Sequence, residues 1–246
     1  MNPLRAVLDF IYPPRCAICG EFVNPNVGVC VKCASDFRLV EHPMCTICGI
    51  PFHGGSDHIC GDCHKKRPSF DKARAWGVHS GALRHAVIAL KFGRKTKLAH
   101  LLARLMTATL LKEFDIADID SIIPVPLHKK RLRWRGFNQS LLLAREISSA
   151  TGIDVDFLSL KRTRLTKPQT RLPLKQRSEN VKGAFQVVRA NFVKDRRILL
   201  VDDVFTSGAT IAECALTLKS HGAIAVYALC AVRAVWDEPE MWEEAF

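Results

Sequence analysis

The residues best suited to carry chemistry lie in one stretch of the chain, residues 197–210. Four apolar residues, 198–201, are followed directly by two adjacent carboxylates, Asp202 and Asp203. A short continuous apolar run is typical of a strand buried on both faces, so the acid pair is expected to end such a strand. Ligands bind at the carboxyl ends of strands in open parallel sheets. The stretch therefore predicts a ligand site at the acid pair.

The loop after the acid pair is suited to hold a phosphate. It is small and hydroxylic, and apolar residues at helical spacing follow it. Backbone N–H groups at a loop and helix start of this kind converge on an anion. Side-chain hydroxyls add donors, and glycine lets the backbone approach closely. We therefore predict a phosphate-binding loop made of Thr206, Ser207, Gly208, Ala209 and Thr210.

Asp202 and Asp203 would repel a phosphate themselves, because carboxylates only accept hydrogen bonds. They can accept from sugar hydroxyls and hold a divalent metal through water. Acid pair and loop together indicate a phosphorylated sugar. A simpler alternative is a buried strand whose acids cap the next helix. A receiver domain also places an acid pair after a strand, but only one helix, one strand and an acidic tail are expected downstream here.

Eight of the ten cysteines form four Cys-x-x-Cys pairs. Two pairs supply the four thiolates of a tetrahedral zinc site, so four pairs predict two structural Zn²⁺ ions. Sequential pairing is simplest, interleaved pairing is also compatible with the spacing, and His42, His53, His58 or His64 could replace a cysteine. Disulfides or a redox dithiol fit a fourfold repeat less well. The predicted ligands are Cys16, Cys19, Cys30, Cys33, Cys45, Cys48, Cys60 and Cys63.

A basic segment that contains proline, residues 65–69, predicts a boundary between a zinc-ribbon domain at 1–68 and a second domain at 69–246. Residues 1–10 do not resemble a secretion signal, and no apolar run approaches the ~18 residues of a membrane span. We therefore expect a cytoplasmic protein without membrane insertion. A reducing compartment agrees with cysteines that bind metal.

The second domain shows the alternation of an α/β fold with a mostly parallel sheet. Pro124 and Pro126 stand one residue apart and must end their strand, because proline cannot continue the ladder. The apolar patterns predict strands at 73–78, 121–125, 198–201 and 223–232, and helices at 83–90, 98–111 and 140–149.

Basic residues are concentrated around the predicted site. The net charge is +12, and residues 127–182 hold fourteen basic and four acidic residues. Arg135 and Asn138 precede the helix at 140–149, where they suit anion binding. Lys91 begins a cationic segment that could meet a pyrophosphate or simply be a solvated helix end. A nucleic-acid surface would also need such a charge excess, and composition does not separate the two.

Residues 161–185 are basic and lack periodicity, which predicts a long functional loop. Its donors, among them Arg162, Gln169 and Arg177, could fold over a departing pyrophosphate and exclude water. A nucleic-acid contact strip and a disordered loop are the alternatives.

The cysteine pairs, residues 124–127, residues 133–139 and residues 201–210 together resemble the ComF family of competence-related phosphoribosyltransferase-like proteins, over almost the full chain. The resemblance implies a type I phosphoribosyltransferase core that binds phosphoribosyl pyrophosphate with Mg²⁺. Asp202 and Asp203 would be the catalytic acids that meet the 2′- and 3′-hydroxyls, and the small loop would hold the 5′-phosphate. Val125 and Pro126 would lie in the pyrophosphate loop. Ser207 stands where threonine is commoner and keeps the hydroxyl.

Two functions follow from these patterns. The first is a phosphoribosyltransferase with an unknown acceptor, linked to DNA uptake during natural transformation. The second is a single-stranded DNA-binding module whose sugar-phosphate pocket is regulatory, with other competence proteins as partners. The segment after the last strand is short and acidic, so an acceptor-binding hood must come from residues 71–115 or from the ribbon. No residue there identifies a base.

Overall fold

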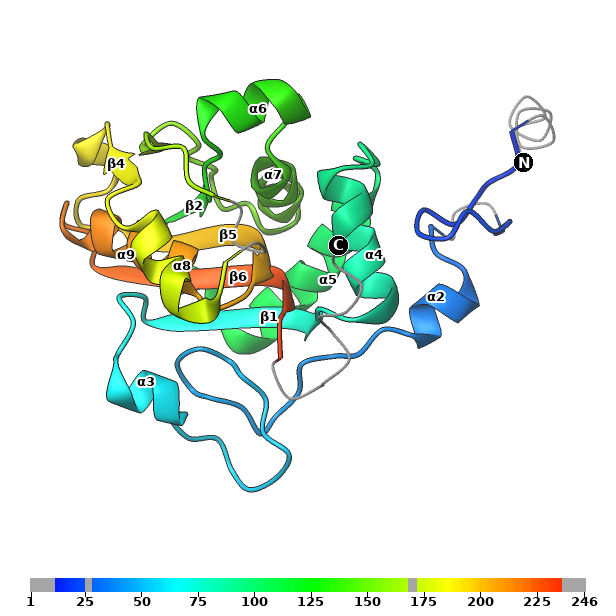
Figure 1. Ribbon diagram of the computed structural model, residues 1–246, viewed down its shortest axis with the longest axis horizontal. Coiled ribbons are helices and arrows are strands. Elements are labelled where there is room, and N and C mark those ends of the chain that lie inside the picture. Colours follow the sequence, from blue (N-terminus) through cyan, green and yellow to red (C-terminus); the bar gives the residue numbers. More distant parts are fainter. Residues whose placement is uncertain (1–11, 25–27, 168–171, 236–246) are drawn as a thin grey trace.

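The computed structural model describes residues 12–24, 28–167 and 172–235. Its centre is a four-stranded sheet in the order β1-β6-β5-β2, with every neighbouring pair parallel. Figure 1 shows this sheet in the middle of the molecule. The strands are β1 (Lys72–Val78), β2 (Ser121–Pro124), β5 (Arg197–Phe205) and β6 (Ala225–Arg233). The predicted α/β fold with a mostly parallel sheet is confirmed.

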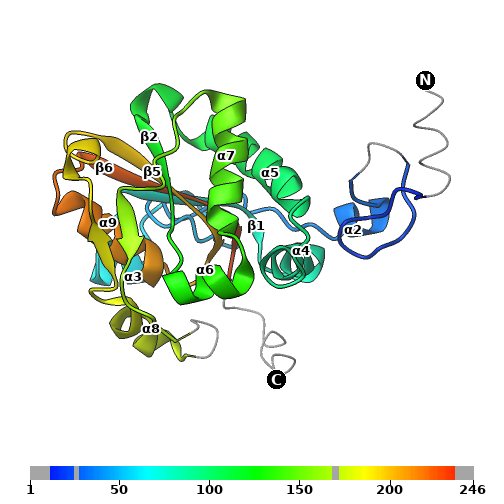
Figure 2. The same cartoon turned by 90° about the horizontal axis from the view of Figure 1, so that it is seen from above.

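Helices cover both faces of this sheet, as Figure 2 shows. Alternate residues of β5 point to opposite faces. The helices are α2 (Val31–Ser35), α3 (Gly61–Lys65), α4 (Gly81–Lys91), α5 (Leu98–Glu113), η1 (Ile116–Asp118), α6 (Lys129–Arg135), α7 (Gln139–Thr151), α8 (Leu174–Val181), η3 (Ala190–Phe192) and α9 (Ala209–Lys219). Leu199 and Val201 pack in one cluster with α4, α5 and α7, whereas Ile198 and Leu200 pack in another with α9.

The acid pair does not end β5, which is a correction to the sequence prediction. Val204 and Phe205 stay paired with β6, so β5 runs through both aspartates to Phe205. The neighbouring strand β2 ends at Pro124, which pairs with Val201. The acid pair therefore lies where β2 has stopped and β5 continues, because apolar residues after the acids extend the ladder.

Residues 161–185 are not one long loop, a second correction. Strands β3 (Leu160–Arg162) and β4 (Phe185–Val187) pair antiparallel, and α8 lies between them in sequence and packs against α9. Strands of three residues are too short to show an alternating pattern in the sequence. The segment is thus an ordered flap over α9 in the part that the structure describes.

The two cysteine clusters have different relations to the sheet. Cys45, Cys48 and Cys63 belong to the same buried cluster as the sheet residues that face α9. Cys16 and Cys33 form a small separate cluster with Val29 and Ala82. Figure 1 shows α2, which carries Cys33, beyond α4 and away from the sheet, whereas α3, which carries Cys63, lies beneath β1. The cysteine group that contains Cys45, Cys48 and Cys63 is therefore part of the main core. The group that contains Cys16 and Cys33 packs beside that core.

No helix in ranges 12–24, 28–167 and 172–235 has the length and apolar character needed to cross a bilayer.

A buried ion pair joins the end of α5 to the edge of the sheet. Arg74 Nε lies 2.8 Å from Glu113 Oε2, and the side chains are only 5% and 9% exposed. His42 Nε2 lies 2.9 Å from the other carboxylate oxygen. We expect Glu113→Gln to lower the free energy of unfolding by about 3 kcal/mol, because it leaves a buried guanidinium without its counter-charge.

Urea titration would measure this loss. Glu146→Gln is the matched control, since Glu146 pairs at 2.8 Å with His100 but both side chains are exposed. Its loss should stay below about 1 kcal/mol. Equal losses in the two variants would contradict the structural role given to Glu113.

Candidate functional site

The acid pair on β5 is closely held and has one open acceptor. Ser140 Oγ donates to Asp202 Oδ1 at 2.9 Å, and the backbone N–H of Asp203 donates to the same oxygen. Lys91 Nζ lies 3.0 Å from Asp203 Oδ1. Asp203 Oδ2 is buried and has no hydrogen-bond partner among the described residues. A buried acceptor without a partner is costly, and a ligand hydroxyl would relieve that cost.

The electrostatics of the pair favour a bound cation or hydroxyl donor. Burial, reinforced by the charge of Asp203, raises the pKa of Asp202 to about 7, while Lys91 opposes the shift. Burial, together with the charges of Lys91 and Arg84, lowers the pKa of the nearby His79 to about 4. His79 is therefore neutral at physiological pH, and Lys91 is the cation that contacts the pair directly.

The raised pKa of Asp202 predicts a pH-dependent gain in stability from Asp202→Asn. A folded-state pKa above the unfolded value means that ionisation destabilises the folded state, increasingly from pH 4 to pH 7. We expect Asp202→Asn to raise the melting temperature relative to wild type at pH 8, and by a smaller amount at pH 5.5. Thermal unfolding followed by circular dichroism would show this. A gain that grows as the pH falls would contradict the assignment.

The predicted phosphate-binding loop connects β5 to α9. Gly208 has φ of 73°, and α9 begins at the next residue, Ala209. The N-cap of α9 is this glycine, which has no side chain of its own to bond the first N–H groups of the helix. A Cβ on Gly208 would lie 2.7 Å from Cζ of Phe205. Thr206 and Thr210 are half-buried, and Ser207 is exposed.

The structure brings the segment after β2 to the acid pair. The Val125 N–H donates to Val201 O at 2.9 Å, which places Val125 and Pro126 beside the start of the pair. Asn138 Nδ2 donates to Val125 O at 3.1 Å, and Asn138 Oδ1 accepts from the Ser140 N–H. Asn138 thus caps α7 and anchors the turn.

Two cations from separate helices approach the same carboxylates. Lys91 is the last residue of α4, and Arg135 is the last residue of α6. Burial lowers the pKa of Arg135, while the charges of Asp203 and Asp202 act in the opposite direction. Arg135 also donates to Gln139 Oε1. The predicted cations Lys91 and Arg135 therefore converge on the acid pair.

The flap residues occupy two different environments. The Arg162 guanidinium lies 5.2 Å from the centre of the Phe185 ring and donates to Thr166 Oγ1. Burial lowers the pKa of Arg162, and the charge of Asp202 partly offsets this. Arg177 is buried, and its Nε donates to Leu172 O at 3.0 Å, a contact within the flap. Gln169 lies outside the described residues.

Three residues at the site were not singled out by the sequence patterns. Ser140 contacts Asp202 across 62 residues of chain, and His79 follows the end of β1. Arg233, at the end of β6, lies over the Phe205 ring at 4.5 Å. Ser140 could have been found from its place in the first turn of a predicted helix that follows a strand, because that end of the helix faces the ligand edge.

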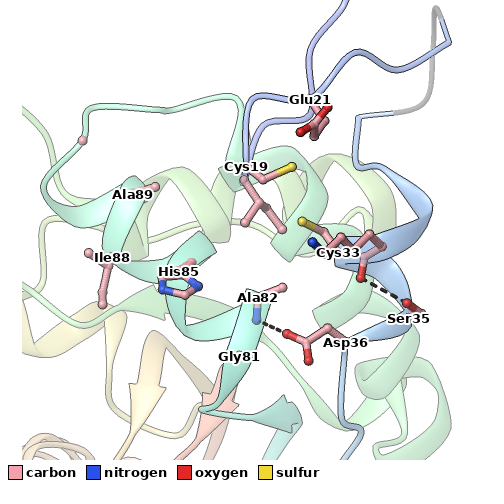
Figure 3. Close-up of a pocket in the computed structure, with 13 residues that line it drawn as sticks. Cys19, Glu21, Cys33, Ser35, Asp36, Gly81, Ala82, His85, Ile88 and Ala89 are labelled. Atoms are coloured by element: carbon pink, nitrogen blue, oxygen red, sulfur yellow. Dashed lines mark hydrogen bonds between the residues drawn. The ribbon is translucent and has the colours of Figure 1, made fainter. Parts of the chain in front are cut away.

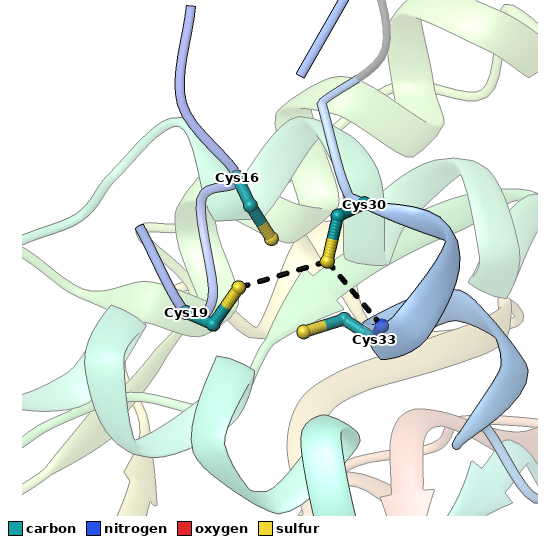
Figure 4. A group of neighbouring side chains, drawn as sticks. All are labelled: Cys16, Cys19, Cys30 and Cys33. Atoms are coloured by element: carbon teal, nitrogen blue, oxygen red, sulfur yellow. Dashed lines mark hydrogen bonds between the residues drawn. The ribbon is translucent and has the colours of Figure 1, made fainter. Parts of the chain in front are cut away.

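The cysteines form two compact Cys₄ groups, as Figure 4 shows for the first. The four sulfur atoms of each group lie within 4.8 Å of one another. The Sγ–Sγ distance is 3.6 Å between Cys19 and Cys30 and 3.8 Å between Cys48 and Cys60. Tetrahedral Zn–S bonds of about 2.3 Å require about 3.8 Å between sulfurs, so both groups fit Zn²⁺.

Sequential pairing is confirmed, because each group combines two consecutive Cys-x-x-Cys pairs. Burial would raise the pKa of Cys45, but backbone N–H groups of Cys60, Cys48 and Ile47 outweigh it and lower the pKa to about 6. Burial raises the pKa of Cys48 in the same group to about 11, so Cys45 ionises before this neighbour. His42 is used by Asp57 and Glu113, outside both groups.

Arg233 connects the second Cys₄ group to the loop at residues 206–210. Its Nη2 lies 3.4 Å from Cys48 Sγ, and its Nη1 donates to Cys48 O. The same guanidinium lies on the ring of Phe205, which also packs against the Phe70 ring and lies beside Gly208. The contacts therefore run without a break from Cys48 through Arg233 and Phe205 to Gly208.

A cavity of about 960 Å³ lies between the first Cys₄ group and α4. Figure 3 shows Cys19 and Cys33 on one side and Ala82, His85 and Ile88 on the other. The acid pair and the phosphate loop do not line it.

Comparison with known proteins agrees with this anatomy. The chain matches the family model of the double zinc ribbon domain over residues 7–64. It is 33% identical over 212 residues to DNA utilization protein YhgH of Escherichia coli, which covers 85% of this chain and 91% of the relative. It is also 33% identical over 215 residues to competence protein F of Haemophilus influenzae, covering 85% and 92%. The chain belongs to the ComF family. Within this family it is 25% identical to competence protein ComFC of Bacillus subtilis, over 81% of each chain.

Among solved structures, this ComF protein is similar to a purine phosphoribosyltransferase from Pyrococcus horikoshii. The identity is 16% over 55% of this chain and 80% of the other, with a TM-score of 0.33. A hypoxanthine phosphoribosyltransferase from Staphylococcus aureus is 13% identical over 58% and 76%, with a TM-score of 0.34.

Proposed function

We propose that this protein binds phosphoribosyl pyrophosphate with Mg²⁺ and acts as a phosphoribosyltransferase in DNA uptake or utilisation. The observation that carries the proposal is the acid pair, with a buried, unpartnered oxygen on Asp203, on the strand that leads through Gly208 into α9. Hydroxyl donors and a phosphate are the groups that such a pair and such a helix end bind together. The names of its relatives refer to DNA utilization and competence, and for this reason we place the proposed activity in DNA uptake or utilisation.

Each side chain has a role in this proposal. Asp202 and Asp203 accept hydrogen bonds from the 2′- and 3′-hydroxyls, and Ser140 keeps Asp202 oriented. Residues 206–210 hold the 5′-phosphate through backbone N–H groups and hydroxyls. Val125, Pro126, Lys91 and Arg135 border the pyrophosphate.

In this proposal Lys91 contacts Asp203 when the site is empty and the pyrophosphate when the ligand is bound. In this structure its ammonium group offsets the charge of Asp203, which would otherwise be a buried carboxylate beside another. Asp202 and Asp203 would hold Mg²⁺ through water, and Lys91 would then contact the pyrophosphate oxygens. The chemistry that Mg²⁺ supplies is charge neutralisation on the leaving group.

Transfer breaks the bond between sugar C1 and the pyrophosphate oxygen, and the electron pair leaves with pyrophosphate. The acceptor's lone pair forms the new bond to C1. Positive charge develops on the sugar ring in between, and Asp202 and Asp203 stabilise it through the hydroxyls they hold. The flap residue Arg162, near Asp202, stabilises the departing pyrophosphate and helps to exclude water.

Isotope-labelled phosphoribosyl pyrophosphate with Mg²⁺ tests the proposal in an equilibrium-binding assay. Wild type should bind, and Asp202→Asn combined with Asp203→Asn should bind at least about 100-fold more weakly, since two charged acceptors are lost. Asp154→Asn with Asp195→Asn is the control, because both residues are exposed and the charge change is the same. Absence of binding by wild type, or equal weakening in the control, would reject the proposed function.

A second candidate, binding of single-stranded DNA, is favoured by α6. Five of its seven residues are basic, and Lys129, Lys130 and Arg133 are exposed. A strand bound through phosphates should lose affinity steeply as salt rises. Gel-shift titration of a thymidine oligonucleotide at 50 mM and 200 mM salt would test it. Absence of a shift, or a shift insensitive to salt, would count against this candidate.

A further inference from the structure

The two Cys₄ groups differ at one equivalent position. Cys19 and Cys48 are each the second cysteine of the first Cys-x-x-Cys pair in their group. Cys48 is buried, and the guanidinium of the buried Arg233 lies 3.4 Å from its sulfur. Cys19 is exposed. The same ligand position is therefore enclosed in the second group and open to solvent in the first.

Cys19 also lines the cavity of about 960 Å³ between the first group and α4. Figure 3 shows its side chain at the edge of this cavity. The opposite wall is formed by α4, through Ala82, His85 and Ile88. A space of this size holds many water molecules. Small polar solutes can therefore reach the Cys19 sulfur without a movement of the chain.

The chemistry of a zinc-bound thiolate makes this access important. Four thiolates outweigh the charge of one Zn²⁺, so the sulfur atoms of such a group stay nucleophilic. At Cys48 burial keeps solutes away, and the charge of Arg233 stabilises the thiolate and lowers its nucleophilicity. The susceptibility of a cysteine to oxidation follows its thiolate character and its exposure. Cys19 combines both properties.

Cys30 is placed to form a disulfide with Cys19. Their Sγ atoms are 3.6 Å apart, and Figure 4 shows the two sulfur atoms facing each other. Cys30 is partly exposed, whereas Cys16 and Cys33, the other members of the group, are buried. The two most accessible sulfur atoms of the group are thus neighbours.

We propose that the first Cys₄ group is an oxidation site for peroxides, at which Cys19 and Cys30 form a disulfide and the zinc ion is released. With hydrogen peroxide, the Cys19 thiolate attacks one oxygen, the O–O bond breaks, and hydroxide leaves with the electron pair. The Cys30 thiolate then attacks the Cys19 sulfur, the S–O bond breaks, and a second hydroxide leaves. Two thiolates are oxidised to one disulfide, and the peroxide is reduced. A group that has lost half of its thiolates no longer completes a tetrahedral zinc site.

Oxidation of this group leaves the main core intact. The first group contributes only a small cluster with Val29 and Ala82. Its further link to α4 is Asp36, whose carboxylate accepts from the Ala82 N–H at 2.6 Å. The second group stays within the main core cluster. The inference does not depend on the binding of phosphoribosyl pyrophosphate.

Release of zinc from the full chain during treatment with hydrogen peroxide tests the proposal, followed with a chromogenic zinc chelator. Wild type loaded at both groups should release one ion at least about 10-fold faster than the other. Peptide mass spectrometry should then find a disulfide between Cys19 and Cys30. Cys214 and Cys230, which are buried and belong to neither group, should still be reduced. Circular dichroism should still show cooperative thermal unfolding.

Cys19→His is the matched variant, because histidine is also a zinc ligand but has no thiolate to oxidise. It should hold zinc in both groups and release neither ion at the fast rate of wild type. The proposal is overturned if wild type releases both ions together or neither, or if the first disulfide forms within the second group. It is also overturned if zinc leaves only as cooperative unfolding is lost, or if Cys19→His releases an ion as fast as wild type does.

Discussion

Gly208→Val should reduce the affinity for phosphoribosyl pyrophosphate by about 100-fold and lower the free energy of unfolding by about 3 kcal/mol. Gly208 has φ of 73°, which a β-branched residue adopts only at a cost of about 1–2 kcal/mol. Its Cβ would also meet Cζ of Phe205 at 2.7 Å. The loop must therefore shift, and the N–H groups at the start of α9 would no longer converge on the phosphate. Isothermal titration and urea unfolding would measure the two losses.

Gly152→Val is the matched control for this experiment. Gly152 has φ of 77° and ends α7, but a Cβ there would meet nothing within 4 Å. It should cost only the backbone strain, about 1–2 kcal/mol, and leave the ligand affinity unchanged. If both variants bind the ligand as wild type does, residues 206–210 are not the phosphate-binding loop.

Cys48→Ser should abolish cooperative folding of the whole chain, whereas Cys19→Ser should remove one zinc ion and leave the core folded. The two substitutions are chemically identical but act in different surroundings. Cys48 packs in the main core cluster and contacts the buried Arg233. Cys19 is exposed, in a group that contributes only a small cluster beside α4. Structural zinc is worth about 10–16 kcal/mol in finger peptides, which is comparable to the stability of a whole domain.

Zinc content by atomic absorption and thermal unfolding by circular dichroism would separate these outcomes. Wild type should hold two zinc ions, and Cys19→Ser should hold one and keep a cooperative transition. Phosphoribosyl pyrophosphate affinity should survive in Cys19→Ser, because its group is not linked to Phe205. Loss of cooperative unfolding in Cys19→Ser, or its retention in Cys48→Ser, would contradict the different roles given to the two groups.

The parts of the site that could be predicted from sequence are those that depend on local chemistry. For the small loop at 206–210, the adjacent acids and the four cysteine pairs, residue types within a few positions of one another are enough to predict a binding role. Lys91, Arg135 and Asn138 were predicted as anion-binding residues from charge and helix position. In the fold, Lys91 contacts Asp203, the charges of both acids act on Arg135, and Asn138 donates to Val125 O.

The parts that escaped prediction depend on contacts between distant segments. Arg233 reaches Cys48 across 185 residues of chain, and no local pattern announces such a contact. The extent of β5 was missed because apolar residues after a charged pair read as loop until the partner strand β6 is known. The flap was missed because β3 and β4 are each too short to show a period, and they stabilise one another only when paired.

The discrimination between ribose 5-phosphate and 2-deoxyribose 5-phosphate tests the central claim most directly. The two ligands share the phosphate and differ in one hydroxyl that Asp202 and Asp203 should bind. By isothermal titration, wild type should bind the ribose form at least about 10-fold more tightly, as expected for a hydrogen bond to a charged group. The double asparagine variant should lose most of that preference. Equal affinity of wild type for both sugars, or a preference that persists in the variant, would contradict the assignment of the acid pair as a sugar-hydroxyl site.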